Sequence, residues 1–84
     1  MESRERLGTA LHISRSSGNL ILDSLGVARI GTTVQDAKGK KIGIVFDVFG
    51  PTTNPFIAIK PSIETPERLL GKALYIRNRR RKGM

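Results

Sequence analysis

The chain has 84 residues, the length of a single small domain, which leaves little room for a deep substrate pocket beside a core. Its 15 Lys and Arg residues outnumber seven Asp and Glu, and the net charge of +8 favours phosphate-bearing partners. The absence of cysteine excludes disulfides and thiolate metal sites, and no apolar run approaches the ~20 residues of a membrane-spanning helix. The charged residues after Met1 do not resemble a secretory signal, so we expect a cytoplasmic protein without a membrane partner.

The first half of the chain contains short apolar runs separated by turn residues, a pattern typical of β-strands. The run Leu7–Ile13 is followed by a polar turn cluster and then by Leu20–Asp23, so these two runs are expected to form a hairpin. A weaker run covers Thr32–Gln35. The next residues predict a tight turn in which Gly39 adopts positive φ.

The second half begins with the longest run, Lys41–Phe49, which carries apolar residues on both faces. The core face expected from simple alternation consists of Ile42, Ile44, Phe46 and Val48. The opposite face consists of Gly43, Val45, Asp47 and Phe49. Further strands are predicted at Phe56–Lys60 and Ala73–Arg77, with a short helical turn between them that begins near Pro66.

Six short strands with Gly-rich connections predict an all-β fold, a small six-stranded closed β-barrel with one short helical turn. Closure of the barrel removes the exposed strand edges that would favour aggregation. We place the barrel domain at residues 1–77 and a flexible basic tail at residues 78–84.

No group of residues in the sequence indicates catalysis, a metal site or a cofactor site. The single histidine, His12, lies in the first strand without a cluster of possible metal ligands near it, and it fits a partly exposed strand residue. The glycines do not have the spacing of a phosphate-binding loop. We therefore expect a protein that is not an enzyme and that needs no cofactor or metal.

The segment Phe49–Phe56 is the strongest candidate for a functional site. Its two prolines stiffen the loop between two phenylalanines, so less entropy is lost when a partner binds. Two interpretations fit: Phe49 closes one end of the barrel core, or the segment forms an exposed apolar patch that docks on a protein. The candidate docking residues are Val45, Asp47, Phe49, Gly50, Pro51, Asn54, Pro55 and Phe56.

The basic residues concentrate near the C-terminal end, whereas residues 1–76 carry ten basic and seven acidic residues. This segment either solubilises the chain or contacts phosphate groups. The candidate phosphate-contacting residues are Arg77, Arg79, Arg80, Arg81 and Lys82.

The sequence Gly39–Pro51, followed by Asn54–Pro61, closely resembles the GAR subunit of H/ACA ribonucleoprotein particles, which carry out RNA-guided pseudouridine formation. The most specific part is Asp-Val-Phe-Gly-Pro, residues 47–51, together with Asn-Pro-Phe, residues 54–56. The similarity covers nearly all of Leu7–Arg77. The long Arg-Gly-Gly arms of eukaryotic members are absent, so the chain resembles the archaeal form.

The resemblance implies a barrel of the kind found in translation factors and flavin reductases. It implies a non-catalytic accessory subunit that docks on a dyskerin-type pseudouridine synthase and aids loading or turnover of substrate RNA during rRNA modification. Contact with the H/ACA guide RNA is then expected to be indirect. Because an uncovered aromatic patch favours association, the isolated chain is expected to form a weak homodimer.

Two other interpretations stay open. A stand-alone RNA-binding β-barrel, ribosomal or chaperone-like, also fits the net charge of +8. The spacing within Asp36–Asp47 is similar to that of barrel adaptors of the photosynthetic-reaction-centre type. Those adaptors do not normally continue into the Phe-Gly-Pro and Asn-Pro-Phe sequences found here.

Overall fold

The structure, a computed structural model, describes residues 2–24, 28–51 and 53–79, with the backbone alone for residues 2–4, 78 and 79. One short 3₁₀ helix, η1 (Pro66–Leu69), accompanies the strands. The strands are β1 (Glu2–Ile13), β2 (Leu20–Asp23), β3 (Thr33–Gln35), β4 (Lys41–Phe49), β5 (Phe56–Pro61) and β6 (Ala73–Arg79).

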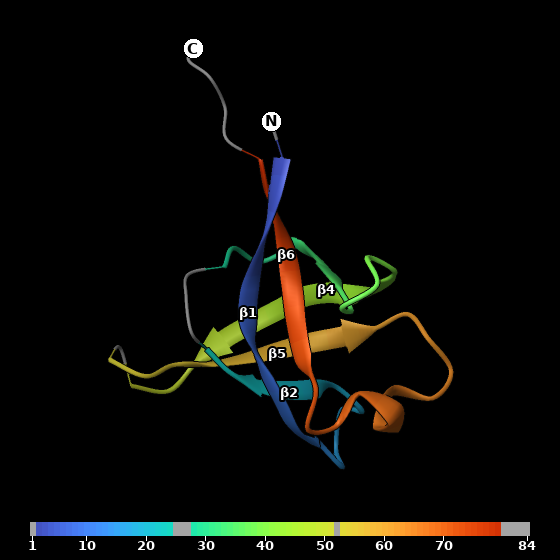
Figure 1. The fold of residues 1–84 in the computed structure, drawn as a ribbon. Helices are drawn as coiled ribbons and strands as arrows, with labels where there is room; N and C mark the ends of the chain where they lie inside the picture. The colour runs from blue at the N-terminus through green and yellow to red at the C-terminus, as the bar shows by residue number, and fades with distance from the viewer. Residues whose placement is uncertain (1, 25–27, 52, 80–84) are drawn as a thin grey trace.

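The six strands close into one antiparallel barrel in the order β1-β2-β5-β4-β3-β6. The fold predicted from the sequence, an all-β closed barrel with one helical turn, is confirmed. The first hairpin also forms as expected, since β1 pairs with β2. In Figure 1, β1 and β6 cross in front of β4, β5 and β2, so the two groups of strands enclose the core between them.

The core consists of apolar side chains from every strand and from η1. Leu69 places the apolar side of η1 against this core and covers one end of the barrel. The side chains with less than 2% exposure are Leu7, Leu20, Leu22, Val34, Ile42, Val45, Ile57, Ile59 and Leu74. Branched aliphatic residues dominate because they pack densely against a pleated surface.

Strands β1 and β6 are both longer than the sequence predicts. Glu2–Arg6 pair in register with Tyr75–Arg79, so β1 begins five residues before Leu7 and β6 ends two residues after Arg77. Figure 1 shows this ribbon of two strands rising above the barrel toward the chain ends. Most residues of this ribbon are polar, so the sequence shows no apolar pattern there, and the pairing depends on backbone hydrogen bonds. Residues 80–84 of the expected tail lie outside the described residues.

The backbone requires glycine at two positions. At Gly8, a Cβ would collide with the main-chain carbonyl of Asp23, so the closing of β2 onto β1 requires a residue without a side chain. Gly39 has φ of 88° in the turn between β3 and β4, as the sequence predicts.

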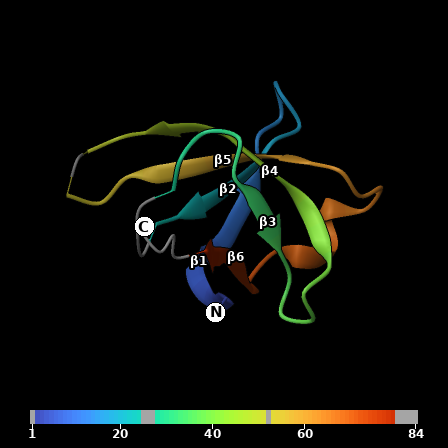
Figure 2. The ribbon, with the colours of Figure 1, turned by 90° about the horizontal axis from the view of Figure 1, so that it is seen from above.

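Strand β4 separates two distinct ends of the molecule. Its last residues continue into a hairpin with β5 that extends from one side of the barrel (Figure 2). Its first residues lie at the opposite side, next to the β3–β4 turn and η1 (Figure 2). The two ends therefore present different chemistry to solvent.

Candidate functional site

The exposed end of the β4–β5 hairpin carries a pair of aromatic rings. Phe49 and Phe56 lie opposite each other in the register, and their ring centroids are 5.8 Å apart with 30° between the ring planes. Phe49 is 44% exposed, so it does not close the barrel core. Phe56 is partly buried beneath it. Aromatic pairs at such a distance support each other by offset packing while leaving one ring available to a partner.

A β-bulge interrupts β4 at Phe46. Val45 lies opposite Ile59 and Asp47 lies opposite Ala58, so Phe46 is an extra residue on the β4 side. Phe46 is 54% exposed, and Asp47 beside it is also exposed. The bulge thus leaves two consecutive side chains, Phe46 and Asp47, on the outside of the barrel.

A further bulge at Ile42 shifts the phase of the first half of β4. Val34 pairs with Gly43 and Gln35 with Lys41, so Ile42 is the extra residue against β3. From this point Gly43 and Val45 face inward, and Val45 is fully buried.

Four predictions from simple alternation are wrong in β4. Ile44 was expected in the core, but it is partly exposed and does not belong to the core cluster, because Gly43 and Val45 on either side of it face inward. Val45 was expected to dock on a partner, but its side chain lies in the core and has 0% exposure. Phe46 and Val48 were expected in the core, but they are 54% and 39% exposed. Val48 pairs with a buried residue of β5, yet it lies where the hairpin leaves the barrel, so less of the core covers it.

A matching bulge occurs in β1 at Leu11. Ala10 pairs with Leu22 and His12 with Ile21, which leaves Leu11 as the extra residue. Leu11 therefore joins His12 outside the barrel instead of alternating with it, and it is 45% exposed. The outer side of this wall is apolar from β1 to β4. We define the outer apolar face as Leu11, Ile21, Phe46, Phe49, Phe56 and Ala58.

Ile21 and Ala58 form the middle of the outer apolar face. Each lies between two core residues of its own strand, so its side chain points outward, and the two residues are paired across β2 and β5. They are only 7% and 5% exposed because neighbouring side chains cover them. Sequence reasoning missed Leu11, Phe46 and this pair, since a bulge left no mark in the residue pattern.

The loop between Phe49 and Phe56 contains the remaining predicted docking residues. Gly50 has φ of 97°, and Pro51 and Asn54 are exposed. The backbone N–H of Asn54 donates to the carbonyl of Pro51 at 3.2 Å, which closes a turn. The carbonyl of Pro55 accepts from the N–H of Ser24 at 3.1 Å and ties the loop to the end of β2. The structure thus groups these residues around the Phe49–Phe56 pair.

Asp47 gives the apolar face a charged border. Its Oδ1 accepts a hydrogen bond from the N–H of Val48 at 2.9 Å, and the side chain is otherwise open to solvent. A carboxylate at the rim of an apolar surface adds to the selectivity for a partner more than to its affinity.

The candidate phosphate-contacting residues are only partly described. Arg77 is exposed near the end of β6 and has an interaction partner. Arg79 belongs to the same strand by its backbone. Arg80, Arg81 and Lys82 lie outside the described residues.

The titratable residues do not assemble a reactive site in the described part of the chain. His12 is exposed on β1. Among the described residues, no three side chains of the types His, Cys, Asp and Glu come together as a metal site. No described helix has the length and apolarity to cross a membrane. The described surface offers exposed apolar side chains and charged groups, which suit the binding of another molecule.

Comparison with known proteins finds a sequence relative and a solved structure with a similar fold. A protein of Methanothermobacter thermautotrophicus, described as uncharacterized, is 42% identical over 74 residues, covering 83% of this chain and 79% of the relative. A solved structure described as the Gar1 domain of NAf1 has a TM-score of 0.70 at 23% identity, covering 90% of this chain and 85% of that one. No family model matches the chain. The structural likeness shows a shared barrel fold.

Proposed function

We propose that this chain, which belongs to the same family as the Methanothermobacter thermautotrophicus protein, is a non-catalytic accessory subunit of an H/ACA-type RNA-guided pseudouridine synthase complex. In this role the barrel docks on a dyskerin-type catalytic subunit and aids loading or turnover of substrate RNA. The complex would serve rRNA modification, and guide RNA contact through the docking site would be indirect.

The observation that carries this proposal is the outer apolar face on a barrel that shares its fold with a Gar1 domain. Leu11, Phe46 and Phe49 are each at least 44% exposed although they are large and apolar. Large apolar side chains grouped on one face of a small domain indicate a protein-binding surface. The resemblance of residues 47–56 to the GAR subunit names the partner class.

The outer apolar face suits stable docking on a partner protein. Phe46 and Phe49 would enter apolar pockets of the synthase, and the loop around Pro51 and Asn54 would contact their rim. Because β-pairing fixes the backbone of the hairpin up to Phe49, little order has to be created on binding. A rigid subunit placed beside the active site can then bias the position of a substrate-holding segment of the synthase.

The proposal is tested by capture of the synthase subunit from the same organism on the tagged full chain. Phe46→Glu and Phe49→Glu should each lower the affinity by at least about tenfold, since each places a charge within a desolvated contact. Ala37→Glu is the matched control, because it adds the same charge at an exposed residue of the β3–β4 turn, at the opposite end of β4 from Phe49. Circular dichroism confirms that each variant is folded.

Unchanged synthase binding by folded Phe46→Glu and Phe49→Glu proteins would rule out the outer apolar face as the docking site. Absence of any binding by the unaltered chain would rule out the accessory role. The stand-alone RNA-binding barrel is the second candidate, favoured by the net charge of +8. It requires tight RNA binding by the isolated chain at physiological salt, lost when Arg77–Met84 are removed.

A further inference from the structure

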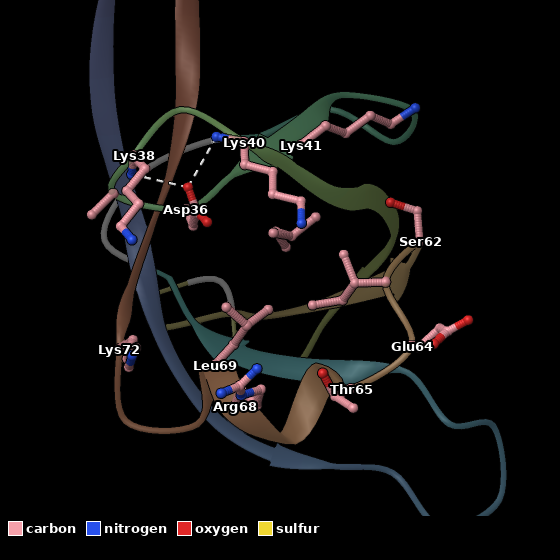
Figure 3. Close-up of a pocket in the computed structure, with 13 residues that line it drawn as sticks. Asp36, Lys38, Lys40, Lys41, Ser62, Glu64, Thr65, Arg68, Leu69 and Lys72 are labelled. Carbon is pink, nitrogen blue, oxygen red and sulfur yellow. Dashed lines mark hydrogen bonds between the residues drawn. The ribbon is translucent and has the colours of Figure 1, made fainter.

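A basic cleft of about 750 Å³ lies at the end of the barrel opposite the aromatic hairpin. The β3–β4 turn forms one side, and the segment from the end of β5 through η1 forms the other (Figure 3). Its apolar floor contains Ile42, Ile63 and Leu69. The outer apolar face and the cleft share no residue.

The cleft is strongly cationic. Five basic side chains line it against two carboxylates, those of Asp36 and Glu64, which leaves a formal net charge of +3. The basic residues are Lys38, Lys40, Lys41, Arg68 and Lys72. Figure 3 shows the Lys40 ammonium and the Arg68 guanidinium extending toward the space from opposite sides, while Glu64 points outward.

The carboxylate of Asp36 is engaged by the turn itself. Its Oδ1 accepts hydrogen bonds from the backbone N–H groups of Lys38 and Lys40, each at 2.9 Å. The N–H of Asp36 in turn donates to the carbonyl of Lys40 at 3.0 Å. The carboxylate therefore orders the backbone that carries both lysines, which line the cleft.

The other side of the cleft is held just as firmly by backbone hydrogen bonds. The N–H of Arg68 donates to Thr65, and the N–H of Lys72 donates to Leu69, at 3.1 and 3.0 Å. The carbonyl of Lys72 also accepts from Ala10 of β1 at 3.1 Å. The backbone that carries these cationic side chains is therefore fixed, although the side chains themselves are flexible.

We propose that this cleft binds the sugar–phosphate backbone of an RNA strand, without reading its bases. Like charges gathered on one cleft repel each other, and a polyanion relieves this repulsion while releasing its counterions. Four of the five cations are lysines, whose compact ammonium groups bind phosphate oxygens as point charges. None of the 13 lining residues is aromatic, so bases have no stacking surface.

The inference goes beyond the docking role, and only the choice of RNA over DNA rests on the proposed function. The sequence assigned phosphate contacts to the C-terminal segment, whereas the cleft belongs to the barrel itself. β4 separates the cleft from the aromatic hairpin by nine residues, roughly 26 Å along an extended strand. A subunit docked through the hairpin would therefore leave the cleft open toward a bound RNA.

The test measures binding of the full-length chain to a fluorescent single-stranded RNA of about 12 nucleotides across a salt series. The Lys40→Gln/Arg68→Gln variant removes two cleft charges. The matched control, Arg15→Gln/Lys60→Gln, removes two exposed charges outside the cleft. The cleft variant should lower the affinity at least about fivefold and reduce the slope of log K against log salt by about 1.4, at roughly 0.7 per lost phosphate contact. The control should change the affinity less than about twofold.

Equal losses of RNA affinity in the two double variants would show that binding depends on net charge alone, and would overturn the proposal that the cleft is the binding site. A loss of RNA affinity that occurs only when Arg80, Arg81 and Lys82 are changed to glutamine would also overturn it. Poly-glutamate serves as an acidic polypeptide probe, and displacement of RNA by poly-glutamate at equal charge concentration would overturn the assignment to RNA. Phe49→Glu should bind RNA normally, so a failed synthase capture and a failed cleft are told apart.

Discussion

Leu11 and Phe46 are the extra residues of two β-bulges that lie at opposite ends of one cross-strand row of the barrel wall. Between them the row contains Ile21 and Ala58, whose outward side chains are covered by neighbours. Across four strands the two bulges stand no more than about 15 Å apart. Each bulge leaves two consecutive side chains outside the barrel, Leu11 with His12 and Phe46 with Asp47.

The first prediction concerns the neighbours Val45 and Phe46. Val45→Ala removes fully buried methyl groups and should lower the free energy of unfolding by about 2 kcal/mol, or Tm by about 10 °C. Phe46→Ala trims an exposed ring and should change that free energy by less than about 0.5 kcal/mol. Urea unfolding of the two proteins measures both values. A larger loss for Phe46→Ala than for Val45→Ala would contradict the bulge.

The second prediction concerns the close contact at Gly8. Gly8→Ala places a methyl group against the main-chain carbonyl of Asp23 and should destabilise the barrel by about 3 kcal/mol. Gly18→Ala is the control, because Gly18 has φ of 75° but open space around it, and backbone strain there costs about 1 kcal/mol. Thermal unfolding compares the two variants. Similar Tm values would show that β2 does not press against Gly8.

The third prediction concerns Asp36 in the β3–β4 turn. Asp36→Ala removes the acceptor for two backbone N–H groups and should lower the free energy of unfolding by roughly 1–2 kcal/mol. The control is Glu64→Ala, since the exposed Glu64 carboxylate points outward at the same cleft. It should change stability by less than about 0.5 kcal/mol. Chemical denaturation tests the contrast, and equal effects would mean that the carboxylate does not order the turn.

The fourth prediction concerns self-association of the isolated chain. An outer apolar face without its partner should form a weak homodimer, with a dissociation constant on the order of 0.1–1 mM. Phe46→Glu should abolish this dimer, whereas Ala37→Glu in the β3–β4 turn, at the opposite end of β4, should leave it intact. Sedimentation velocity over a concentration series measures the effect. A dimer that survives Phe46→Glu must use a different surface.

The strand positions followed from the sequence because local chemistry determines them. Leu20–Asp23 and Lys41–Phe49 were predicted with the boundaries that the structure has, since apolar runs end where glycine, proline and polar residues begin. The Gly39 turn was predicted for the same reason. The extra length of β1 and β6 was not, because polar strand residues gain order from a partner strand that lies distant in the sequence.

By itself, the sequence determined a six-stranded closed barrel and pointed to the segment Phe49–Phe56 as its most unusual surface. Only the tertiary structure decided which apolar side chains face outward, because a bulge depends on how two strands pair and one extra residue reverses the alternation beyond it. Val45 and Phe46 exchanged their expected places for this reason. The basic cleft also required the fold, since Lys40 and Arg68 are separated by two strands and approach each other only when the start of β4 pairs with the end of β5 and η1 packs on the core.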